Sequence, residues 1–307
     1  MDSVELDRNQ PSGPTKEINV KVLVTGATGY IGSHVCKLLK EHGHWVEGWD
    51  VNFHGEYNDV SKWLNSFEAL DITDRFGVHG VYDSVVHLAG RSIVPQSLKE
   101  PSEYYRVNTM GTSHLLDKVN TSNFIFASTS SAFEMASPYA RSKVAAEDII
   151  KEKSSGYTIF RFFNVSGTDG VNRQLGAPTH LIRVAAMVAA NKFPNINIFG
   201  VDYPTRDGTC IRDYIHVCDL SAAIVKAVEN GPLNTPYECL GGNTGYSVLE
   251  VLDTMEKVTG KKLNRIISDR RKGDAVASVV DKLSDYATLT KTIEDMCLNQ
   301  YELEKSS

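Results

Sequence analysis

The sequence predicts an α/β fold in which a doubly wound parallel sheet carries a smaller α/β lobe. From Asn19 to about Phe163, short β-branched runs alternate with segments of helical pattern and length, and this rhythm stops after Asn164. Continuous apolar runs separated by helix-sized segments are typical of parallel strands that are buried on both faces. The predicted strands are Val20–Thr25, Trp45–Asp50, Ser84–Leu88, Phe124–Ala127 and Thr158–Phe163.

The second part of the chain predicts the smaller lobe. It opens with Ser166–Gly176, which is rich in Gly, Asp and Asn. Its expected elements are a helix near Thr179–Asn191, strands near Asn197–Phe199, Tyr214–His216 and Tyr237–Leu240, and a terminal helix, Ile293–Leu303. We therefore expect a first domain over residues 19–165, to which the chain returns near 208–235, and a smaller lobe over 166–207 and 236–307. Residues 1–18 lack an apolar core and are expected to be a disordered leader.

The composition excludes several classes of protein. Of 307 residues, 41% are hydrophobic and 23% charged, the proportions of an ordinary globular protein. The longest nearly apolar stretch, Leu181–Ala190, is about half of what a bilayer-spanning helix needs, so no membrane partner is expected. The net charge of −6, with Lys and Arg scattered singly, argues against a nucleic-acid partner. Five cysteines without a C-x-x-C pair suggest neither disulfides nor a metal site, and they favour a cytoplasmic location.

A glycine-rich turn follows the first predicted strand. Val22–Gly32 reads VLVTGATGYIG, a G-x-x-G-x-x-G motif that ends the strand and opens a helix over Tyr30–His42. Glycines permit a tight turn and a close approach of backbone N–H groups to a pyrophosphate, and the helix N-terminus adds a favourable dipole. The motif predicts a Rossmann-like dinucleotide site. Its cofactor contacts are expected from Gly26, Thr28, Gly29, Tyr30, Ile31 and Gly32.

The second predicted strand ends in Asp50, where a carboxylate accepts hydrogen bonds from the adenosine ribose. An acid at that position repels a 2′-phosphate, so the expected cofactor is NAD and not NADP. Asp71 and Ile72 are candidates to hold the adenine. A plain turn at the end of a strand explains these two residues equally well.

Tyr139 and Lys143 form a Y-x-x-x-K element at the start of a predicted helix, which places the two side chains one turn apart on one face. A free tyrosine, with a pKa of about 10, is a poor base at neutral pH, but a lysine ammonium and a nicotinium charge stabilise its phenolate. The pair is therefore suited to move a proton while NAD takes a hydride. The strand Phe124–Ala127 delivers Thr129 to the carboxyl edge of the sheet, where ligands of such folds bind.

Several longer stretches carry a family resemblance. They are Val22–Gly32, Val85–Gly90 (VVHLAG), Pro101–Thr112 (PSEYYRVNTMGT), Phe124–Ser131, Ser137–Lys143, Arg161–Asn164 (RFFN) and Ile198–Leu220 (IFGVDYPTRDGTCIRDYIHVCDL). Through them the chain, from about Lys21 to Asp281, resembles the extended short-chain dehydrogenase/reductase superfamily and, within it, the UDP-galactose (UDP-glucose) 4-epimerases. The resemblance implies an isomerase of galactose metabolism with NAD as cofactor and a UDP-sugar as substrate. It also implies a homodimer formed through the helix Pro101–Val119, and a smaller lobe that binds the substrate.

The resemblance implies roles for individual residues. Tyr139 is the catalytic base, Lys143 binds the nicotinamide ribose, and Thr129 hydrogen-bonds the sugar 4-hydroxyl. Further implied cofactor contacts are Leu88, Ala89, Gly90, Asn108 and Phe162. Implied substrate contacts besides Thr129 and Tyr139 are Asn164, His180, Leu181, Arg212, Arg271, Asp274 and Ser278. Two arginines from distant segments suit a diphosphate, although Arg212 beside Asp213 fits a structural ion pair as well.

In the implied reaction, Tyr139 takes the proton of the sugar 4-hydroxyl while the C4 hydride passes to NAD, and the 4-keto sugar turns over before the hydride returns. A dehydratase on this scaffold is expected to carry an Asp-Glu pair directly after the catalytic threonine, whereas Ser130 and Ser131 follow Thr129. The rival interpretations are a nucleotide-sugar decarboxylase or dehydratase of the same superfamily, and a catalytically idle NAD-binding regulatory protein.

The chain departs from the family pattern at three places. Only the five residues Glu134–Pro138 separate Phe133 from Tyr139, about fifteen fewer than in the family, which predicts a more open site. Ser92 stands where the family places a lysine near the cofactor, and Arg91 is the candidate substitute. Ser278 stands where a large residue excludes N-acetylated sugars in some epimerases, so UDP-N-acetylhexosamines are expected substrates beside UDP-glucose and UDP-galactose.

Overall fold

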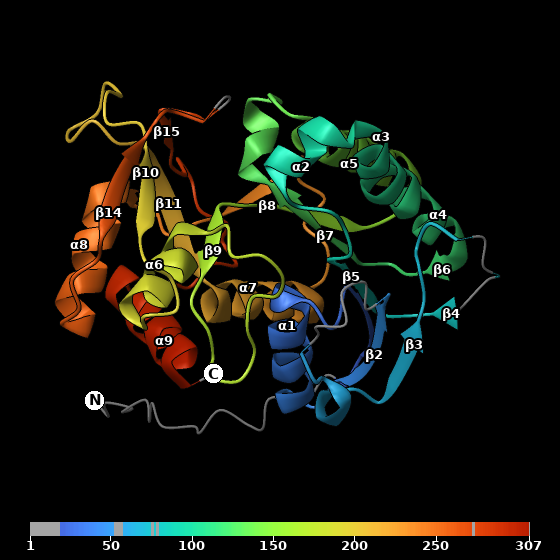
Figure 1. Ribbon diagram of the computed structural model, residues 1–307. Helices are drawn as coiled ribbons and strands as arrows, with labels where there is room; N and C mark the ends of the chain where they lie inside the picture. Colours follow the sequence, from blue (N-terminus) through green and yellow to red (C-terminus); the bar gives the residue numbers. More distant parts are fainter. Residues whose placement is uncertain (1–18, 52–57, 75–76, 78–79, 272–273, 307) are drawn as a thin grey trace, which may run out of the picture.

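A seven-stranded parallel sheet forms the centre of the molecule in the computed structural model, which describes residues 19–51, 58–74, 77, 80–271 and 274–306 (Figure 1). Its strands are β1 (Lys21–Thr25), β2 (Trp45–Asp50), β3 (Ser66–Ala69), β5 (Ser84–His87), β7 (Phe124–Thr129), β8 (Tyr157–Phe162) and β12 (Glu238–Leu240). They lie in the order β12-β8-β7-β5-β1-β2-β3. The chain therefore winds outward in both directions from β1 and β5, and the carboxyl ends of these two strands flank the crevice in which such folds bind ligands.

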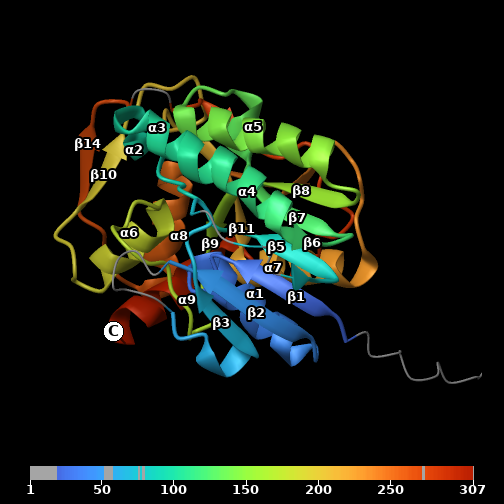
Figure 2. The same ribbon diagram turned by 90° about the vertical axis from the view of Figure 1, so that its right-hand side faces the viewer.

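Helices cover both faces of this sheet, as the side view shows (Figure 2). In β1, Val22 and Val24 pack with α1 (Tyr30–Glu41) and α7 (Val217–Asn230). Leu23, which points the opposite way, packs with α4 (Gly111–Lys118) and α5 (Pro138–Lys153). Because successive side chains of a strand alternate between faces, a strand buried on both faces is apolar throughout. The predicted doubly wound α/β sheet is thus confirmed.

The helix expected over Pro101–Val119 is interrupted by a wider turn. It consists of α3 (Pro101–Tyr104), the π-helical segment η2 (Tyr105–Met110) and α4, and it follows the short helix α2 (Val94–Lys99). Single π-helical turns inside α-helices occur often at functional sites. Here the π-helical segment contains Asn108, one of the predicted site residues.

One predicted strand lies elsewhere than expected. The sequence predicts a strand of the smaller lobe near Tyr237–Leu240, but this strand, β12, pairs in parallel with β8 and forms an edge of the central sheet. The reason is packing, because Leu240 is fully buried in the same core as Phe160 and Phe162. The strand β3 at the other edge has no counterpart in the prediction, since its sequence SFEA is largely solvent-exposed and carries no apolar run.

The smaller lobe has its own core. Its helices are α6 (Leu181–Ala189), α8 (Val248–Thr259) and α9 (Ile293–Ser306), and its strands are β9 (Asn164–Ser166), β10 (Ile196–Phe199), β11 (Ile211–His216), β13 (Gly245–Ser247), β14 (Arg265–Ser268) and β15 (Ala277–Ser278). Apolar side chains of α6, α8 and α9 pack together there. The remaining short elements are η1 (Ser61–Trp63), η3 (Ser130–Phe133), β4 (Gly80–Val81) and β6 (Val119–Asn120). Among the helices of the described residues, none is both long and apolar enough to cross a membrane.

Candidate active site

The glycine turn between β1 and α1 is closed so tightly that side chains are excluded. A Cβ on Gly32 would lie 2.0 Å from the carbonyl oxygen of Gly26, and a Cβ on Gly26 would lie 2.8 Å from the backbone nitrogen of Ala89. Gly26 also has a φ of +73°, which favours glycine. Within the described part of the chain, no side chain caps the start of α1, so its first N–H groups are available to an anion such as a pyrophosphate.

Asp50 ends β2 beside this turn and is held in place by it. Its Oδ2 accepts hydrogen bonds from the backbone N–H of Thr28 at 3.0 Å and from the Thr28 hydroxyl at 2.7 Å. Asp71 and Ile72 follow β3. The Asp71 carboxylate accepts from Thr73 N–H at 2.8 Å, and Ile72 is buried close to Gly111. These contacts fit the turn interpretation of Asp71 and Ile72, and the adenine role stays a prediction.

The segment after β5 runs directly along the glycine turn. Leu88 N–H donates to the carbonyl of Thr25 at 3.1 Å, and Ala89 N–H donates to the Thr25 hydroxyl at 3.3 Å. His87 lies between the hydroxyls of Thr25 (2.7 Å) and Thr112 (2.9 Å). Burial, with a smaller contribution from the charge of Lys143, lowers the pKa of His87 to about 3. His87 is therefore neutral and structural.

The Asn108 side chain fixes the loop after β5 through hydrogen bonds to the backbone of Arg91. Its Oδ1 accepts from the N–H of Arg91 at 2.8 Å, while its Nδ2 donates to the carbonyl of Arg91 and to the hydroxyl of Ser142, each at 3.0 Å. A Cβ on Gly90 would lie 2.9 Å from Asn108 Oδ1 and 3.2 Å from Lys143 Nζ. The π-helical segment, the loop at Gly90 and helix α5 thus meet at one point.

Thr129, Tyr139 and Lys143 are brought together at the carboxyl edge of the sheet. Thr129 ends β7 and is almost fully buried, and its hydroxyl is close enough to Tyr139 on α5 to act on the pKa of that phenol. Burial raises the pKa of Tyr139, the Thr129 hydroxyl opposes this, and the nearby Tyr104 adds to it. Lys143 Nζ donates to the carbonyl of Ala127 at 2.9 Å, and burial lowers its pKa to about 8. At neutral pH the protein therefore presents a phenol and an ammonium group here. Phe162 ends the neighbouring strand β8.

The connection between Phe133 and Tyr139 is a tight turn. It leaves η3 through Met135, whose φ is +51°, and enters α5 at Ser137, whose hydroxyl accepts the N–H of Ala140 at 3.2 Å. Phe133 and Met135 are 48% and 47% exposed. This short connection therefore leaves two large apolar side chains at the surface, and the more open site stays a prediction.

The Arg91 side chain, the candidate substitute for the family lysine, forms an ion pair. Its guanidinium pairs with the carboxylate of Glu100 at 2.9 Å, and both side chains are partly exposed. A surface pair of this kind is weak, so it leaves Arg91 able to exchange partners. The substitution of the family lysine by Arg91 stays a prediction.

The predicted substrate residues of the smaller lobe converge around β11. Arg212 lies on β11 directly opposite Ser278 of β15. Arg271 pairs with Asp274 at 3.2 Å, and its guanidinium lies 4.4 Å from the ring centre of Phe199. Arg212, Asp274 and Arg271 all act on the pKa of the same buried thiol, Cys210, whose burial raises it. Two guanidinium groups are thus placed near one another for an anion.

Asn164 and His180 are two further predicted substrate residues. Asn164 begins β9, and its Nδ2 donates to the carbonyl of Asp213 at 2.8 Å. His180 precedes α6, which begins at Leu181. Its side chain is open to solvent on one side, while burial by the surrounding protein and the charge of Arg183 lower its pKa. His180 is therefore neutral at pH 7 and able to donate or accept a hydrogen bond.

Asp213 is a buried site residue that the sequence interpretation missed. Its carboxylate accepts the backbone N–H groups of Gly242 and Val280, and its burial raises its pKa while these donors oppose the rise. Arg212 donates instead to the carbonyl of Ile211 at 2.8 Å. The alternative of an Arg212–Asp213 ion pair is therefore not what the structure shows. The strand sequence IRDYIH places Asp213 beside Arg212 and gives no signal for backbone donors from distant segments.

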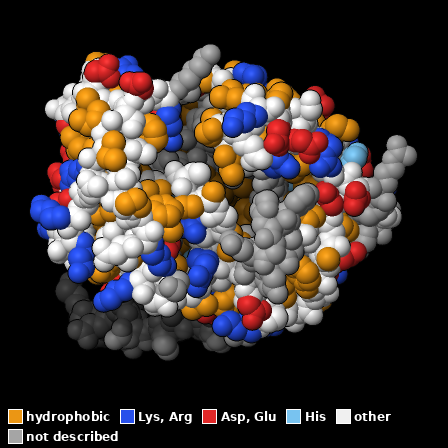
Figure 3. Space-filling view, in the orientation of Figure 1, with side chains coloured by type: hydrophobic (Ala, Val, Ile, Leu, Met, Phe, Trp, Pro, Cys, Tyr) orange, Lys and Arg blue, Asp and Glu red, His pale blue; other side chains and the backbone are white. Residues whose placement is uncertain are grey.

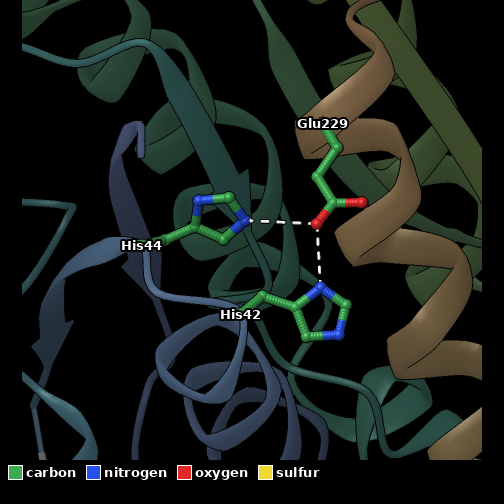
Figure 4. Close-up of side chains that lie close together, drawn as sticks. All are labelled: His42, His44 and Glu229. Carbon is green, nitrogen blue, oxygen red and sulfur yellow. Dashed lines mark hydrogen bonds and ion pairs between the residues drawn. The ribbon is translucent and has the colours of Figure 1, made fainter. Parts of the chain in front are cut away.

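Two histidines and a glutamate meet at the far end of α1 and α7 (Figure 4). One oxygen of Glu229 lies 2.8 Å from His42 Nδ1 and 3.4 Å from His44 Nε2. His44 Nδ1 in turn faces the backbone N–H of Val20 at 3.5 Å. Because Nδ1 faces a donor, the ring proton belongs on Nε2, where it points at Glu229 and removes the lone pair that a metal ion needs. The cluster is therefore a hydrogen-bonded link between two helices.

The surface is hollowed between the smaller lobe and the helices above the sheet, and Lys or Arg side chains lie on the rim of this hollow (Figure 3). Thr129, Tyr139 and Lys143 come from the sheet side, and Arg212 and Arg271 come from the smaller lobe. The arrangement offers a proton-transferring phenol beside a dinucleotide turn, together with cationic groups for a second ligand.

Comparisons with known proteins agree with this arrangement. Residues 22–239 match the model of the NAD dependent epimerase/dehydratase family. The chain is 32% identical to UDP-glucose 4-epimerase of Bacillus subtilis over an alignment that covers 93% of this chain and 97% of the relative. It superposes with a TM-score of 0.83 and 28% identity on UDP-glucose 4-epimerase of Bifidobacterium longum in complex with NAD+ and UDP, covering 93% of this chain and 98% of the other. The UDP-Glc/GlcNAc 4-epimerase of Campylobacter jejuni gives a TM-score of 0.74 and 28% identity, with coverage of 94% and 99%.

Proposed function

The chain belongs to the NAD dependent epimerase/dehydratase family, and we infer from this membership and from its site that it is an NAD-dependent 4-epimerase of UDP-hexoses. UDP-galactose and UDP-glucose are interconverted through a 4-keto sugar. The observation that carries this function is the meeting of Thr129, Tyr139 and Lys143 beside the glycine turn. This trio supplies the proton transfer that epimerisation at a carbinol carbon requires.

The residues around the glycine turn fit NAD. The turn leaves no room for a Cβ on Gly26 or Gly32, α1 starts without a side-chain cap among the described residues, and Asp50 is held next to both. These features suit a pyrophosphate followed by a ribose with a free 2′-hydroxyl. When bound, NAD accepts the C4 hydride of the sugar and returns it to the opposite face. Gly90, Asn108 and Lys143 border the expected nicotinamide end.

Tyr139 accepts the proton of the sugar 4-hydroxyl. Burial holds its phenol protonated, so it needs a neighbouring cation to become a phenolate. Lys143 is that cation, because its pKa of about 8 keeps most of it protonated at pH 7. The Thr129 hydroxyl hydrogen-bonds the sugar 4-hydroxyl and orients it toward Tyr139. Tyr139 then returns the proton when the hydroxyl forms on the other face of the sugar.

The smaller lobe holds the UDP portion. Arg212 and Arg271 offer paired N–H donors to the diphosphate. Asp274, which already pairs with Arg271, fixes the orientation of that guanidinium. Asn164, His180 and Leu181 line the side of this group toward α6. These assignments rest on the convergence of the side chains and on the complex of the Bifidobacterium relative with UDP.

N-acetylated sugars are further proposed substrates. Ser278 is a small side chain opposite Arg212, and it leaves space for an acetamido group next to the expected sugar. The Campylobacter jejuni relative is a UDP-Glc/GlcNAc 4-epimerase, which supports this extension.

Two further properties belong to the proposal, the oligomeric state and the location in the cell. A homodimer is favoured by apolar side chains exposed over α2 and the segment up to Met110, namely Val94, Leu98, Tyr105 and Met110. A cytoplasmic location is favoured by the five cysteines, all of which are free thiols.

The decisive experiment identifies the products that the purified protein forms from UDP-galactose, UDP-glucose and their N-acetylated counterparts. We expect the 4-epimer in each case. Tyr139→Phe is expected to lower turnover by about 10²–10⁴-fold, the range for loss of one acid–base group, while NAD stays bound. Tyr105→Phe, at a partly exposed tyrosine of η2, is the matched control and leaves turnover unchanged. A parent protein that binds NAD and forms no epimer would identify the idle scaffold instead.

A further inference from the structure

A buried ion pair lies directly beneath the proposed catalytic residues. Glu147 on α5 is fully buried, and its two carboxylate oxygens accept from Arg161 of β8, from Nε at 3.0 Å and from a terminal nitrogen at 2.7 Å. Arg161 is 8% exposed, and its guanidinium lies 3.9 Å from the ring centre of Tyr237. A paired fork of this kind fixes both position and direction of the two side chains.

The same carboxylate connects three elements of the active site. Glu147 also accepts the hydroxyl of Ser128. Ser128 immediately precedes Thr129 on β7 and lies opposite Arg161 in the register of β7 and β8. Glu147 follows Tyr139 and Lys143 at intervals of four residues along α5. One side chain thereby ties the helix that carries Tyr139 and Lys143 to the strand end that carries Thr129.

Glu147 is also a carboxylate one helical turn from Lys143. Lys143 is 5% exposed, its Nζ donates to the carbonyl of Ala127, and it lies 4.7 Å from the ring centre of Phe126. Burial lowers the pKa of Lys143 to about 8, and the charge of Glu147 acts in the opposite direction. Since this value is close to a working pH, a small change in nearby charge alters how much of Lys143 is protonated.

Other titratable groups also face this pair. His87 of β5 lies near Lys143 and is neutral, and Tyr139 of α5 is a phenol. Lys151 approaches Glu147 to 3.8 Å and also pairs with the exposed Asp148. Burial raises the pKa of the Cys239 thiol on β12, while the charge of Arg161 lowers it and that of Glu147 raises it, so Cys239 stays a thiol. Among the described residues, Glu147 is thus the carboxylate whose charge acts on the Lys143 ammonium, and Arg161 is the cation paired with it.

We propose that Glu147 is a positioning residue of the active site, which aligns Tyr139 with Thr129 through Ser128 and Arg161 and supplies the negative charge that holds Lys143 as an ammonium. This inference rests on the proposed function for its catalytic consequence. Its electrostatic part concerns Lys143 alone and is measured without turnover.

The test follows the titration of Lys143 by NMR in full-length protein labelled with ¹³C at the lysine ε-carbon, with Lys143→Arg to assign the signal. Glu147→Gln leaves Arg161 as an uncompensated cation, and we expect the Lys143 midpoint to fall by about one pH unit or more. The double variant Glu147→Gln with Arg161→Gln removes both charges. Its midpoint is expected between those of the single variant and the parent, because the charge of Glu147, one helical turn from Lys143, is lost in both variants while the repulsion by Arg161 is lost in the double variant alone.

Two matched variants separate charge from position. Asp148→Asn removes a neighbouring carboxylate that is 66% exposed, and it should leave the midpoint unchanged. Ser128→Ala keeps every charge and breaks only the bond to β7, so it should lower kcat while leaving the midpoint in place. In the active enzyme, the alkaline limb of the kcat profile should move to lower pH in Glu147→Gln and stay fixed in Ser128→Ala.

Equal Lys143 midpoints in the parent and the charge variants would overturn the inference, and so would a single variant that does not titrate below the double one. If the lone buried Arg161 prevents folding of Glu147→Gln, the double variant still decides, since a midpoint equal to or above that of the parent contradicts the proposal. A parent without turnover would refute the proposed function while the NMR titration continued to test Glu147.

Discussion

At the scale of single residues, the glycine turn shows how little space separates a working cofactor site from a broken one. Gly29 and Gly32 both face the carbonyl oxygen of Gly26, but a Cβ would approach it to 3.2 Å at the first position and to 2.0 Å at the second. The first approach requires a movement of a few tenths of an ångström. The second cannot be met without opening the turn between β1 and α1.

Gly32→Ala is therefore expected to lower the free energy of unfolding by about 3 kcal/mol or more, as severe overpacking does, and to weaken NAD binding. Gly29→Ala is the matched control, with an expected loss below about 1 kcal/mol. Urea unfolding of the two variants and an NAD titration of each measure the difference. Similar losses in both variants would show that the steric reading of the turn is wrong.

Lys143 gives the protein a predictable response to alkaline pH. Its folded-state pKa of about 8 lies below the ordinary value of 10.5, so between these values the unfolded chain binds the lysine proton more tightly than the folded chain does. Burial of the Lys143 charge therefore lowers the free energy of unfolding by its full amount below pH 8. This loss disappears as the pH rises to 10.5.

Lys143→Met is thus expected to be more stable than the parent at pH 7, by up to about 3 kcal/mol, with the advantage shrinking toward zero near pH 10. Urea unfolding of the cofactor-free proteins at both pH values gives the difference. The same substitution at the exposed Lys261 serves as control. A gap between parent and Lys143→Met that stays constant with pH would contradict the linkage.

At the scale of elements, the turn between η3 and α5 determines how closed the site is. Residues 134–137 join the two helices directly, and Phe133 and Met135 remain exposed next to the end of β7. Because this turn is short, we expect the 4-keto sugar to have a route to solvent between its formation and its reduction.

We therefore expect a fraction of the cofactor to remain reduced during turnover, visible as a growing NADH absorbance band after UDP-galactose is added. The physical reason is that release of the keto sugar strands the enzyme in its reduced form. Stopped-flow and steady-state absorbance traces measure this, with Tyr139→Phe as the blank. A trace that stays silent while epimer accumulates would show that the short turn confines the intermediate.

Elements differ in how far the sequence predicts them, and the reasons are local. β1, β7 and β8 are buried along most of their length and are rich in apolar residues, so the runs in the sequence predict them. β12 has only three residues, and its place beside β8 depends on Leu240 entering a core built from distant segments. The π-helical turn at Asn108 depends on bonds to Arg91, 17 residues away.

The candidate site divides in the same way. The glycine turn, Asp50 and the Tyr139–Lys143 pair follow from motifs with fixed spacing. Glu147 looks like an ordinary solvated helix position, because its partners Ser128 and Arg161 lie 19 and 14 residues away and become neighbours only when β7 and β8 pair. Asp213 is bound by backbone N–H groups of Gly242 and Val280, and backbone donors leave no trace in a sequence.

At the scale of the whole molecule, the site exists only where two separately packed bodies face each other. One core surrounds the central sheet, and another joins α6, α8 and α9. A ligand that touches both bodies stabilises their arrangement in proportion to its affinity.

UDP is therefore expected to raise Tm, with about 2.7 kcal/mol of added stability at a concentration of 100 times its Kd. Arg271→Ala should weaken UDP binding by about 10–100-fold, the loss expected for a charge-assisted bond, and so remove about 1.3–2.3 kcal/mol of this gain. Arg206→Ala, which breaks a surface pair with Glu250, should lower the basal Tm slightly and leave the UDP increment intact. An increment that survives Arg271→Ala would place the diphosphate elsewhere.

The order of residues along the chain separates chemistry from recognition. Thr129, Tyr139 and Lys143 are encoded within fifteen consecutive positions on β7 and α5, whereas Arg212, Arg271, Asp274 and Ser278 come from later segments that fold into the other core. We therefore expect mutations in the later segments to change which sugar nucleotide is accepted while the proton-transferring residues stay intact. Such a layout lets natural selection, or a protein engineer, exchange specificity by replacing one lobe of the gene product.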